Sequence, residues 1–349
     1  MRAFVITAPG EGALQEVDPP VAMPGEVVID VQRAGICGTD AELFSGHMQY
    51  LQEGRTSYPV RIGHEWMGTV SSVGDGVGRR WIGRRVTGDT MLGCGDCRRC
   101  RGGRHHVCEF RTELGILGRP GALAEQVAIP EIALHELPDE VSDVQGALVE
   151  PGGGALRAVR AAALRPGDRV LVLGPGTIGV LAAMFARAMG AEVHLMGHAD
   201  RSLPFAATLG FDGVWTAETL PDLPWDAVID ASGAPELPAR AVQLVEPGKR
   251  VVYIGLAGSP SLMDSRELVL KDVTAVGILG ASAGLSGAID AYARGEVDPA
   301  PLVAAVVRLE DLAPALGGEF PADAGPGPKI HVSFRTGKPS SHAPRGVRA

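Results

Sequence analysis

The sequence predicts an α/β protein in which a doubly wound parallel sheet is combined with a mostly-β domain. Two observations lead to this fold class. From residue 169 onward, continuous apolar strands alternate with helical patterns, which is typical of a parallel sheet covered by helices on both faces. Residues 1–140 instead carry short strand-like runs between glycine-rich turns. The 349 residues also exceed one ordinary core and fit roughly two domains.

The expected elements follow one another in a simple order. Short strands are expected at residues 3–7 and 26–34, with further strand-like stretches in GTVSSV and RRVTGD. The parallel sheet and its helices come next, and they end near residues 277–280. Their segments are RVLVLG, TIGVLAAMFARAMG, EVHLMG, WDAVIDASG and KRVVYIGL. A final helix-like AGLSGAIDAYARG and strand-like KIHVSF differ from this pattern, and we expect them to return to the first domain.

The composition excludes two classes of partner. A formal net charge of −9 opposes binding to the phosphates of nucleic acid, which requires a basic surface. No apolar run reaches the roughly 20 residues of a membrane helix, and the N-terminal residues lack the basic start of a signal peptide. We therefore expect a cytoplasmic protein with neither a nucleic-acid nor a membrane partner.

Residues 169–190 carry the pattern of a dinucleotide-binding turn. Three glycines give G-x-G-x-x-G directly after a strand and at the opening of a helix. A tight turn and a close backbone approach would place a pyrophosphate at the helix N-terminus. The alternative is a tight turn in a doubly wound domain that binds something else, but the flanking strands and helix favour a nicotinamide cofactor. The predicted cofactor-binding residues are Gly174, Gly176, Thr177, Ile178 and Gly179.

The residues after the second strand of this unit indicate which cofactor binds. NAD sites usually carry a carboxylate there for the ribose 2′-hydroxyl, whereas this chain has Gly197. Without that acid a 2′-phosphate is not repelled, and His198 and Arg201 could contact it. The sequence therefore favours NADP over NAD. Two alternatives stay open, because Asp200 could take the acidic role and Arg201 could be a solvated residue at the start of a helix.

Four of the five cysteines lie in one short segment, the cysteine lobe at about residues 93–109. Their spacing is C-x2-C-x2-C-x7-C, formed by Cys94, Cys97, Cys100 and Cys108. In a cytosolic chain such a cluster indicates metal binding rather than disulfides. Four thiolates suit a closed, tetrahedral structural zinc site, whereas iron–sulfur clusters usually have other spacings. The arginines of the lobe are interpreted as solvated residues, given the overall acidity.

A second set of metal donors is spread over three segments. Cys37 lies in GICGTD, His64 and Glu65 lie in GHEWMG, and Glu150 lies in LVEPGGG. Residues of these types can converge on a zinc ion that keeps one position open for substrate. A lone cysteine is usually a small hydrophobic residue and a lone histidine a satisfied core group. Only their joint occurrence in this order favours a catalytic site.

The chain resembles the zinc-containing medium-chain alcohol dehydrogenases over nearly its whole length. The motifs GICGTD, GHEWMG, the four cysteines, VEP, GPGTIG and LVLKDVTAVG occur in the family's order. The resemblance implies a GroES-like catalytic domain of residues 1–152 plus 283–349, and a Rossmann domain of residues 153–282. It also implies two zinc ions per chain and a homodimer or homotetramer.

Glu150 stands where the family often has a second cysteine ligand. A glutamate there resembles the sorbitol, threonine and glucose dehydrogenase branch. In that branch Glu65 and Glu150 can exchange as the inner zinc ligand and the partner that holds a water. A carboxylate-rich metal shell, Glu42 and a content of only eight Phe and four Trp suggest a polyol, sugar or related polar substrate, although Glu42 could equally be an exposed helix residue.

The expected reaction moves a hydride between NAD(P) and a small secondary alcohol or ketone. Thr39 is the candidate for passing the hydroxyl proton outward, although a simple turn hydrogen bond is the other interpretation of this residue. Asp40 is expected to support His64. The alternatives are a zinc-independent quinone or enoyl reductase and a non-catalytic nucleotide-binding protein of the same fold. The joint presence of Cys37, His64 and Glu150 opposes both.

Overall fold

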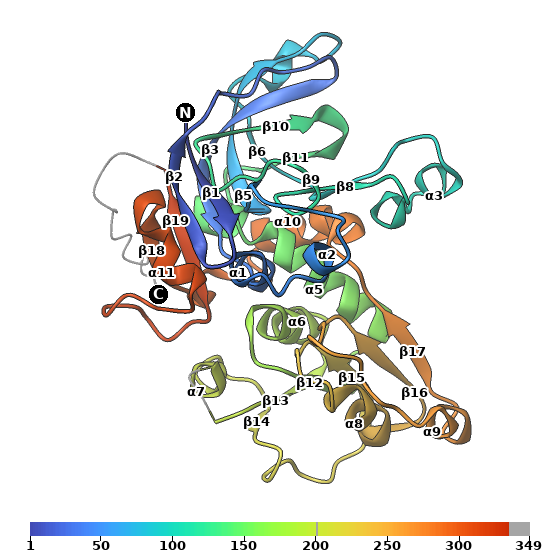
Figure 1. The fold of residues 1–349 in the computed structure, drawn as a ribbon. Coiled ribbons are helices and arrows are strands. Elements are labelled where there is room, and N and C mark those ends of the chain that lie inside the picture. The colour runs from blue at the N-terminus through green and yellow to red at the C-terminus, as the bar shows by residue number, and fades with distance from the viewer. Residues whose placement is uncertain (200–201, 335–349) are drawn as a thin grey trace, which may run out of the picture.

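The computed structural model describes residues 1–199 and 202–334, which form two halves that are each built on a sheet (Figure 1). The first half contains a seven-stranded sheet in the order β11-β6-β5-β3-β19-β18, with β10 paired to β3. A three-stranded sheet of order β2-β1-β4 lies in the same half. The strands of these two sheets are β1 (Arg2–Ala8), β2 (Glu11–Glu16), β3 (Glu26–Gly35), β4 (Val60–Arg61), β5 (Glu65–Val73), β6 (Arg85–Gly88), β10 (Gln126–Pro130), β11 (Leu134–Glu136), β18 (Val303–Arg308) and β19 (Lys329–Ser333).

The second half is a six-stranded sheet in the order β14-β13-β12-β15-β16-β17, in which all neighbouring strands are parallel. The order reverses between β12 and β15, and ligands of such sheets bind beyond the carboxyl ends of the strands at this point. The predicted parallel sheet is therefore confirmed. Its strands are β12 (Arg169–Leu173), β13 (Glu192–Met196), β14 (Gly213–Trp215), β15 (Trp225–Asp230), β16 (Val245–Tyr253) and β17 (Thr274–Gly277), and its helices are α6 (Thr177–Ala188), α7 (Ser202–Ala207), α8 (Leu237–Leu244) and α9 (Ser265–Leu270).

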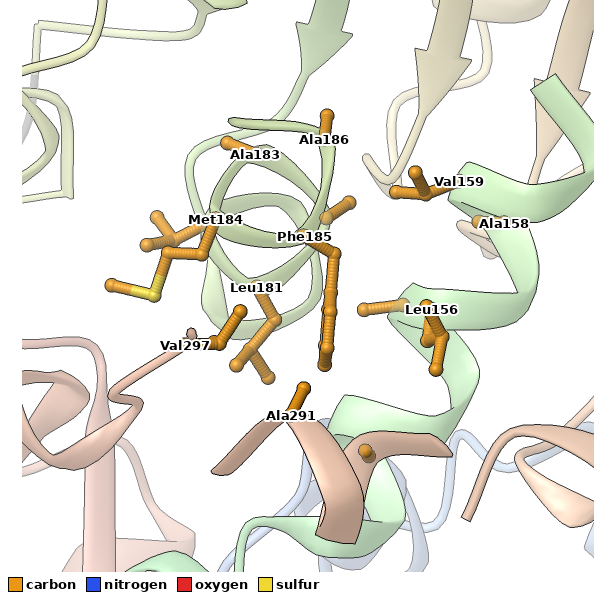
Figure 2. Close-up of a cluster of buried hydrophobic side chains, with 14 of the residues drawn as sticks. Leu156, Ala158, Val159, Leu181, Ala183, Met184, Phe185, Ala186, Ala291 and Val297 are labelled. Carbon is orange, nitrogen blue, oxygen red and sulfur yellow. The ribbon is translucent and has the colours of Figure 1, made fainter. Parts of the chain in front are cut away.

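Helix α5 (Val149–Ala162) connects the two halves and packs against α6 and α10 (Leu285–Ala293). Figure 2 shows this buried cluster, in which Leu156 of α5, Phe185 of α6 and Ala291 of α10 face one another. A glycine run lets the helices approach closely, because a Cβ atom at Gly152 would lie 2.0 Å from the Tyr292 hydroxyl. That hydroxyl donates a hydrogen bond to the carbonyl of Leu148. The packing fixes the first turn of α5, which carries Glu150.

The last segment of the chain divides between the halves. Helix α10 packs on α5, whereas β18 and β19 enter the seven-stranded sheet of the first half. Strand β19 runs antiparallel to β3, with His331 opposite Gly35. The predicted strand KIHVSF therefore lies beside the end of β3, directly before Cys37.

An ion pair at the start of β13 makes the stability of the parallel sheet depend on pH. Arg169 binds both carboxylate oxygens of Glu192 at 2.7 and 2.9 Å, and His194 lies 2.9 Å from the same carboxylate. The hydrogen bond from Arg169 lowers the pKa of Glu192 to about 2. Because the folded-state pKa lies below the unfolded one, the carboxylate stabilises the fold above about pH 5 and loses this effect as the pH falls toward 2.

We therefore expect Glu192→Gln to lower the free energy of unfolding by about 1 kcal/mol at pH 7, a value reduced because the carboxylate is about one third exposed. The difference from the unmodified protein should shrink steadily between pH 5 and pH 3. Urea unfolding of both proteins at each pH measures it. A constant difference over that range would contradict the assignment.

Candidate active site

Three of the predicted metal donors come together in the first half of the molecule. Cys37 precedes α1 (Gly38–Ser45), His64 directly precedes β5, and Glu65 is the first residue of β5. The ligand atoms of the three residues all lie within 4.8 Å of one another, and His64 and Glu65 are 4% and 1% exposed. We call these three residues the metal group. Residues from two separate segments thus form a compact set of sulfur, nitrogen and oxygen donors.

Asp40 ties together the two loops that carry the metal group. Its carboxylate accepts hydrogen bonds from the backbone N–H of Cys37 at 2.9 Å and of Gly63 at 3.0 Å. One of its oxygens also lies 3.6 Å from Nδ1 of His64. Burial alone would lower the pKa of His64, but the Asp40 carboxylate and the Cys37 sulfur raise it well above its ordinary value. This position fits the expected supporting role of Asp40.

Glu150 lies near the metal group, although its carboxylate is not among the three gathered donors. Burial raises the pKa of Glu150 to about 7, and Glu65 adds to this effect while His64 opposes it. Thr39 is the second residue of α1 and is partly buried. The arrangement leaves Glu150 as a nearby fourth candidate donor, a carboxylate whose charge is disfavoured by its surroundings.

Sequence reasoning missed Lys329 of β19, which binds the metal group from the far end of the chain. Its ammonium lies 2.6 and 2.7 Å from the two carboxylate oxygens of Glu65 and is 3% exposed. It also donates a hydrogen bond to the carbonyl of Ile36 at 2.9 Å. The lysine that opens the strand-like segment KIHVSF was the available signal, but the segment did not reveal which strand would lie beside it.

The four cysteines of the lobe also come together, with their sulfur atoms within 4.8 Å of one another. The sulfur atoms of Cys97 and Cys108 lie 3.7 Å apart. Four sulfurs placed tetrahedrally at about 2.3 Å from a zinc ion would lie about 3.8 Å from one another. The geometry therefore fits the closed zinc site predicted for Cys94, Cys97, Cys100 and Cys108.

Backbone N–H groups point at two of these sulfurs. The N–H of Cys100 donates to the sulfur of Cys97 at 3.4 Å, and the N–H of Cys94 donates to the sulfur of Cys108 at 3.5 Å. These bonds lower the pKa values of the Cys97 and Cys108 thiols, whereas burial raises that of Cys100 to about 12. Donors aimed at sulfur stabilise the thiolate form that binds zinc.

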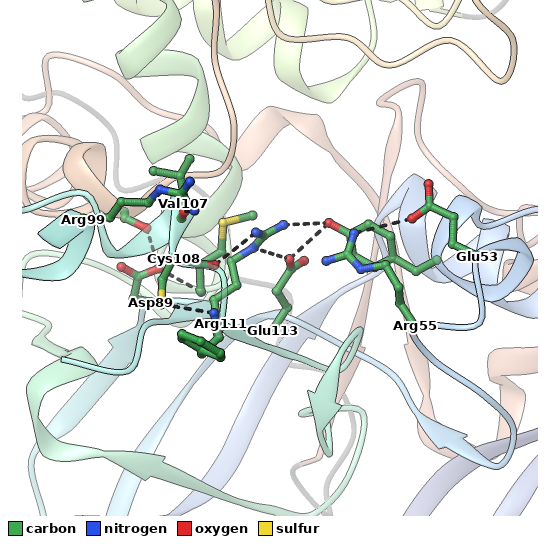
Figure 3. A network of polar contacts seen from close by, with 12 residues as sticks. Glu53, Arg55, Asp89, Arg99, Val107, Cys108, Arg111 and Glu113 are labelled. Carbon is green, nitrogen blue, oxygen red and sulfur yellow. Dashed lines mark hydrogen bonds and ion pairs between the residues drawn. The ribbon is translucent and has the colours of Figure 1, made fainter. Parts of the chain in front are cut away.

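Polar contacts connect the cysteine lobe to the rest of the molecule (Figure 3). Asp89 lies 2.7 Å from Nε2 of His105 in the lobe and accepts a hydrogen bond from the hydroxyl of Ser282 at 2.9 Å. Arg99 donates to the carbonyl of Val107 at 3.0 Å, so this arginine of the lobe has a partner inside the lobe. Asp89 therefore links the lobe to the segment between β17 and α10.

The second half contains a cavity of about 1010 Å³ at the carboxyl ends of its strands, which we call the nucleotide cavity. Four of the predicted cofactor-binding residues line it, namely Gly174, Gly176, Gly197 and His198. Thr177, Ile178 and Gly179 form the first turn of α6 after the glycine turn, and Arg201 lies outside the described residues. Lining residues that were not predicted include Ser202, Thr216, Glu218 and Arg240.

The glycine turn requires glycine at two positions. Gly174 has a φ of +93°, in the left-handed region, and a Cβ atom at Gly179 would lie 1.8 Å from the carbonyl oxygen of Gly174. The helix can therefore pack close to the strand and present its N-terminus to the cavity.

Gly197 is a glycine for a reason that the sequence did not reveal. A Cβ atom there would lie 2.3 Å from Cδ of Pro175, in the middle of the glycine turn. The absence of an acid at position 197 is therefore also a packing requirement. Residues 175 and 197 must be considered together in any change of cofactor preference.

Comparisons with known proteins agree with this architecture. Residues 23–139 match the model of the alcohol dehydrogenase GroES-like domain, and residues 177–294 match that of the zinc-binding dehydrogenases. The chain is 31% identical to L-threonine 3-dehydrogenase of Rhizobium etli over 325 residues, which cover 89% of this chain and 93% of the relative.

Two solved structures share the fold. An alcohol dehydrogenase from Escherichia coli CFT073 in complex with NADH has a TM-score of 0.88 and 26% identity, covering 96% of this chain and 99% of the other. A putative zinc-binding dehydrogenase from Sinorhizobium meliloti 1021 bound to NADP has a TM-score of 0.85 and 27% identity, covering 95% and 98%.

The fold and the metal group define a two-domain oxidoreductase with a Rossmann half. The chain belongs to the zinc-binding alcohol dehydrogenase family, as the resemblance predicted. The predicted reaction class, an NAD(P)-linked alcohol dehydrogenase that acts on a small molecule, is thereby confirmed. In the described part of the chain, no helix combines the length and apolarity needed to cross a membrane.

Proposed function

We propose that the protein transfers a hydride between NADP or NAD and the secondary hydroxyl of a small polar molecule, with zinc held by the metal group. The observation that carries this proposal is the gathering of Cys37, His64 and Glu65 within 4.8 Å in a buried position. Nδ1 of His64 is buried and lies 3.6 Å from the Asp40 carboxylate, as suits an outer carboxylate that orients the ring of a metal-binding histidine. When bound, zinc polarises a hydroxyl or carbonyl oxygen, and the nicotinamide carries the hydride.

The residues of the chain have distinct roles in this proposal. Cys37, His64 and Glu65 hold the metal, while Glu150 serves as an exchanging ligand or holds a water. Asp40 keeps His64 oriented, and the hydroxyl of Thr39 passes the substrate proton outward. A second zinc ion in the cysteine lobe would keep that segment folded.

The substrate class proposed is a polyol, sugar or related polar alcohol. The carboxylate-rich metal shell supports it, as does the similarity to a dehydrogenase that acts on L-threonine. Glu42 no longer supports it, because this residue is exposed and lines a separate surface cavity with His47 and Leu316.

An assay of nicotinamide absorbance with a panel of polyols, sugars and amino alcohols tests the reaction and the substrate class. Each substrate is offered with NADP and NAD separately, and the zinc content is measured first. Turnover on a polar secondary alcohol would support the proposal. Turnover restricted to long apolar alcohols would contradict the substrate class. Full activity after removal of all zinc would contradict the metal-dependent mechanism.

We also propose that NADP is preferred over NAD. Gly197 and His198 line the nucleotide cavity without a carboxylate at the end of β13. The two solved structures described above hold NADH and NADP respectively, so the fold alone is compatible with either cofactor.

Gly197→Asp alone is expected to weaken both cofactors, because its Cβ atom would meet Pro175 at 2.3 Å. Combined with Pro175→Ala, the same change should lower the ratio of kcat/KM for NADP over NAD about tenfold, which corresponds to about 1.4 kcal/mol. Steady-state kinetics on the unmodified protein, the two single variants and the double variant measure it. An unchanged ratio in a folded double variant would place cofactor selection elsewhere.

We propose a catalytic domain of residues 1–152 plus 283–349 and a Rossmann domain of residues 153–282.

We also propose that the protein forms a homodimer or homotetramer. Strand β17 lies at the edge of the six-stranded sheet and is mostly exposed. Exposed apolar residues lie in the segments near it, among them Leu256, Leu262, Val269 and Leu270. An exposed edge strand beside apolar side chains can pair with the same strand of a second copy of the chain, which would cover these side chains. A monomer in sedimentation equilibrium at micromolar concentration would contradict this.

A further inference from the structure

Lys329 makes an unusually complete set of contacts for a buried lysine. Its ammonium donates hydrogen bonds to Oε1 of Glu65 at 2.7 Å and to the carbonyl of Ile36 at 2.9 Å, and it forms an ion-pair contact with Oε2 of Glu65 at 2.6 Å. Ile36 directly precedes Cys37, so one ammonium holds both segments that carry the metal group. The backbone brings β19 there, because the N–H of Ile36 donates to the carbonyl of Ile330 at 3.0 Å.

Gly35 of the neighbouring strand β3 also confines the Glu65 carboxylate. The two residues are direct partners in the pairing of β3 with β5. A Cβ atom at Gly35 would lie 2.2 Å from Oε2 of Glu65. The carboxylate therefore occupies the space that any other side chain at position 35 would need, and it has little freedom to turn toward β3.

A buried ion pair by itself is weak evidence of a functional role, because desolvation can cost as much as the attraction gains. Two comparisons within the molecule favour such a role here. Lys271 binds three backbone carbonyls, those of Val242, Gln243 and Val245, and within residues 1–199 and 202–334 it binds no carboxylate, as suits a lysine that supports the local fold. Glu150, the carboxylate that could exchange with Glu65, makes no ion pair with any residue in the described ranges.

We propose that Lys329 is a positioning residue that holds Glu65 in the metal group, so that Glu65 is the carboxylate that stays in place and Glu150 is the one that exchanges. This rests on the proposed metal site. Outer partners of metal ligands commonly change metal affinity by about 10- to 100-fold when they are removed. Lys329 acts through Glu65, so its effect should disappear when Glu65 no longer carries a carboxylate.

The test measures zinc release from the loaded protein to a coloured chelator. The unmodified protein is expected to release zinc in two phases, one from the metal group and one from the cysteine lobe. The Cys37→Ser variant should lack the phase of the metal group, which identifies that phase. Lys329→Met should accelerate that phase at least tenfold and leave the phase of the cysteine lobe unchanged. In the Glu65→Gln background, Lys329→Met should change the release rate less than twofold.

Two further variants make the result specific. Gly35→Ala keeps the ammonium and displaces the carboxylate by contact, so it should also accelerate release from the metal group. It provides the answer if Lys329→Met fails to fold. Lys271→Met removes a lysine that does not touch the metal group, and its release kinetics should match those of the unmodified protein. The same variants are also loaded with cobalt, and the spectrum of Cys37→Ser is subtracted so that only the d–d bands of the metal group remain. These bands should be altered in Lys329→Met and Gly35→Ala and unchanged in Lys271→Met.

The outcomes separate this proposal from the proposed function. Unchanged release and unchanged cobalt bands in both Lys329→Met and Gly35→Ala would overturn the positioning role while leaving the metal site intact. Equal acceleration by Lys329→Met with and without the Glu65 carboxylate would also overturn it. If the unmodified protein releases zinc from the cysteine lobe alone and shows no turnover, the proposed metal site itself fails.

Discussion

His64→Ala is expected to reduce kcat/KM about a thousandfold while the protein stays folded. The change removes one of three donors and leaves the Asp40 carboxylate buried without its neighbour at 3.6 Å. A zinc Lewis acid supplies several kcal/mol of stabilisation to the reacting oxygen, and its loss corresponds to a factor of this size. Steady-state kinetics, zinc analysis and circular dichroism measure the effect.

The controls for this variant lie close to it in the same half. Cys37→Ser should cause a loss of similar size, because it removes another member of the metal group. His47→Ala removes an exposed histidine whose ring contacts Ser45, and its activity should equal that of the unmodified protein. If His64→Ala or Cys37→Ser retains normal turnover, the catalytic metal site is refuted.

Cys108→Ser is expected to release one zinc ion per chain and to lower the melting temperature by about 10 °C. Cys108 is fully buried, lies 3.7 Å from the sulfur of Cys97 and accepts hydrogen bonds from the N–H groups of Cys94 and Phe110. Without the ion, the remaining thiolates would repel one another and the lobe would lose its internal support. Calorimetry and metal analysis measure both effects.

Loss of zinc from the cysteine lobe should also affect the active site, through the contacts of Asp89. Asp89 contacts His105 of the lobe and Ser282, and its charge contributes to the raised pKa of Glu150. We therefore expect Cys108→Ser to lower activity as well as stability. Cys37→Ser is the matched control, since it should lose zinc and activity but melt close to the unmodified protein. A Cys108→Ser protein with two zinc ions and normal melting would contradict the structural-zinc assignment.

Much of the site could be predicted from the sequence because its parts are local. The four cysteines occupy fifteen residues, so their spacing alone brings the sulfurs within reach of one ion. The glycines at 174, 176 and 179 form one turn between a strand and a helix, and the cavity lies where such a turn places it. Continuous apolar strands were sufficient to predict the parallel sheet, because its inner strands β12, β13 and β15 are buried on both faces.

Cys37 and His64 are a less local case. Their approach was predicted from the resemblance to a family, and the structure shows how it occurs. Strands β3 and β5 pair so that Gly35 lies opposite Glu65, which brings the ends of both segments together. Asp40 then connects the two loops with hydrogen bonds to their backbones.

By itself the sequence determined the fold class, the cysteine lobe and the nucleotide turn, because these depend on spacing and periodicity within short segments. The donors of the metal group were predicted from the order of motifs that the chain shares with a family. Only the tertiary structure decided that Lys329 contacts Glu65 across 264 residues and that Glu42 is exposed on the surface. It also showed that position 197 must be glycine because a Cβ atom there would collide with Pro175. Those contacts arise from the pairing of distant strands and from side-chain packing. No local pattern encodes them, because each depends on which surfaces the complete fold brings together.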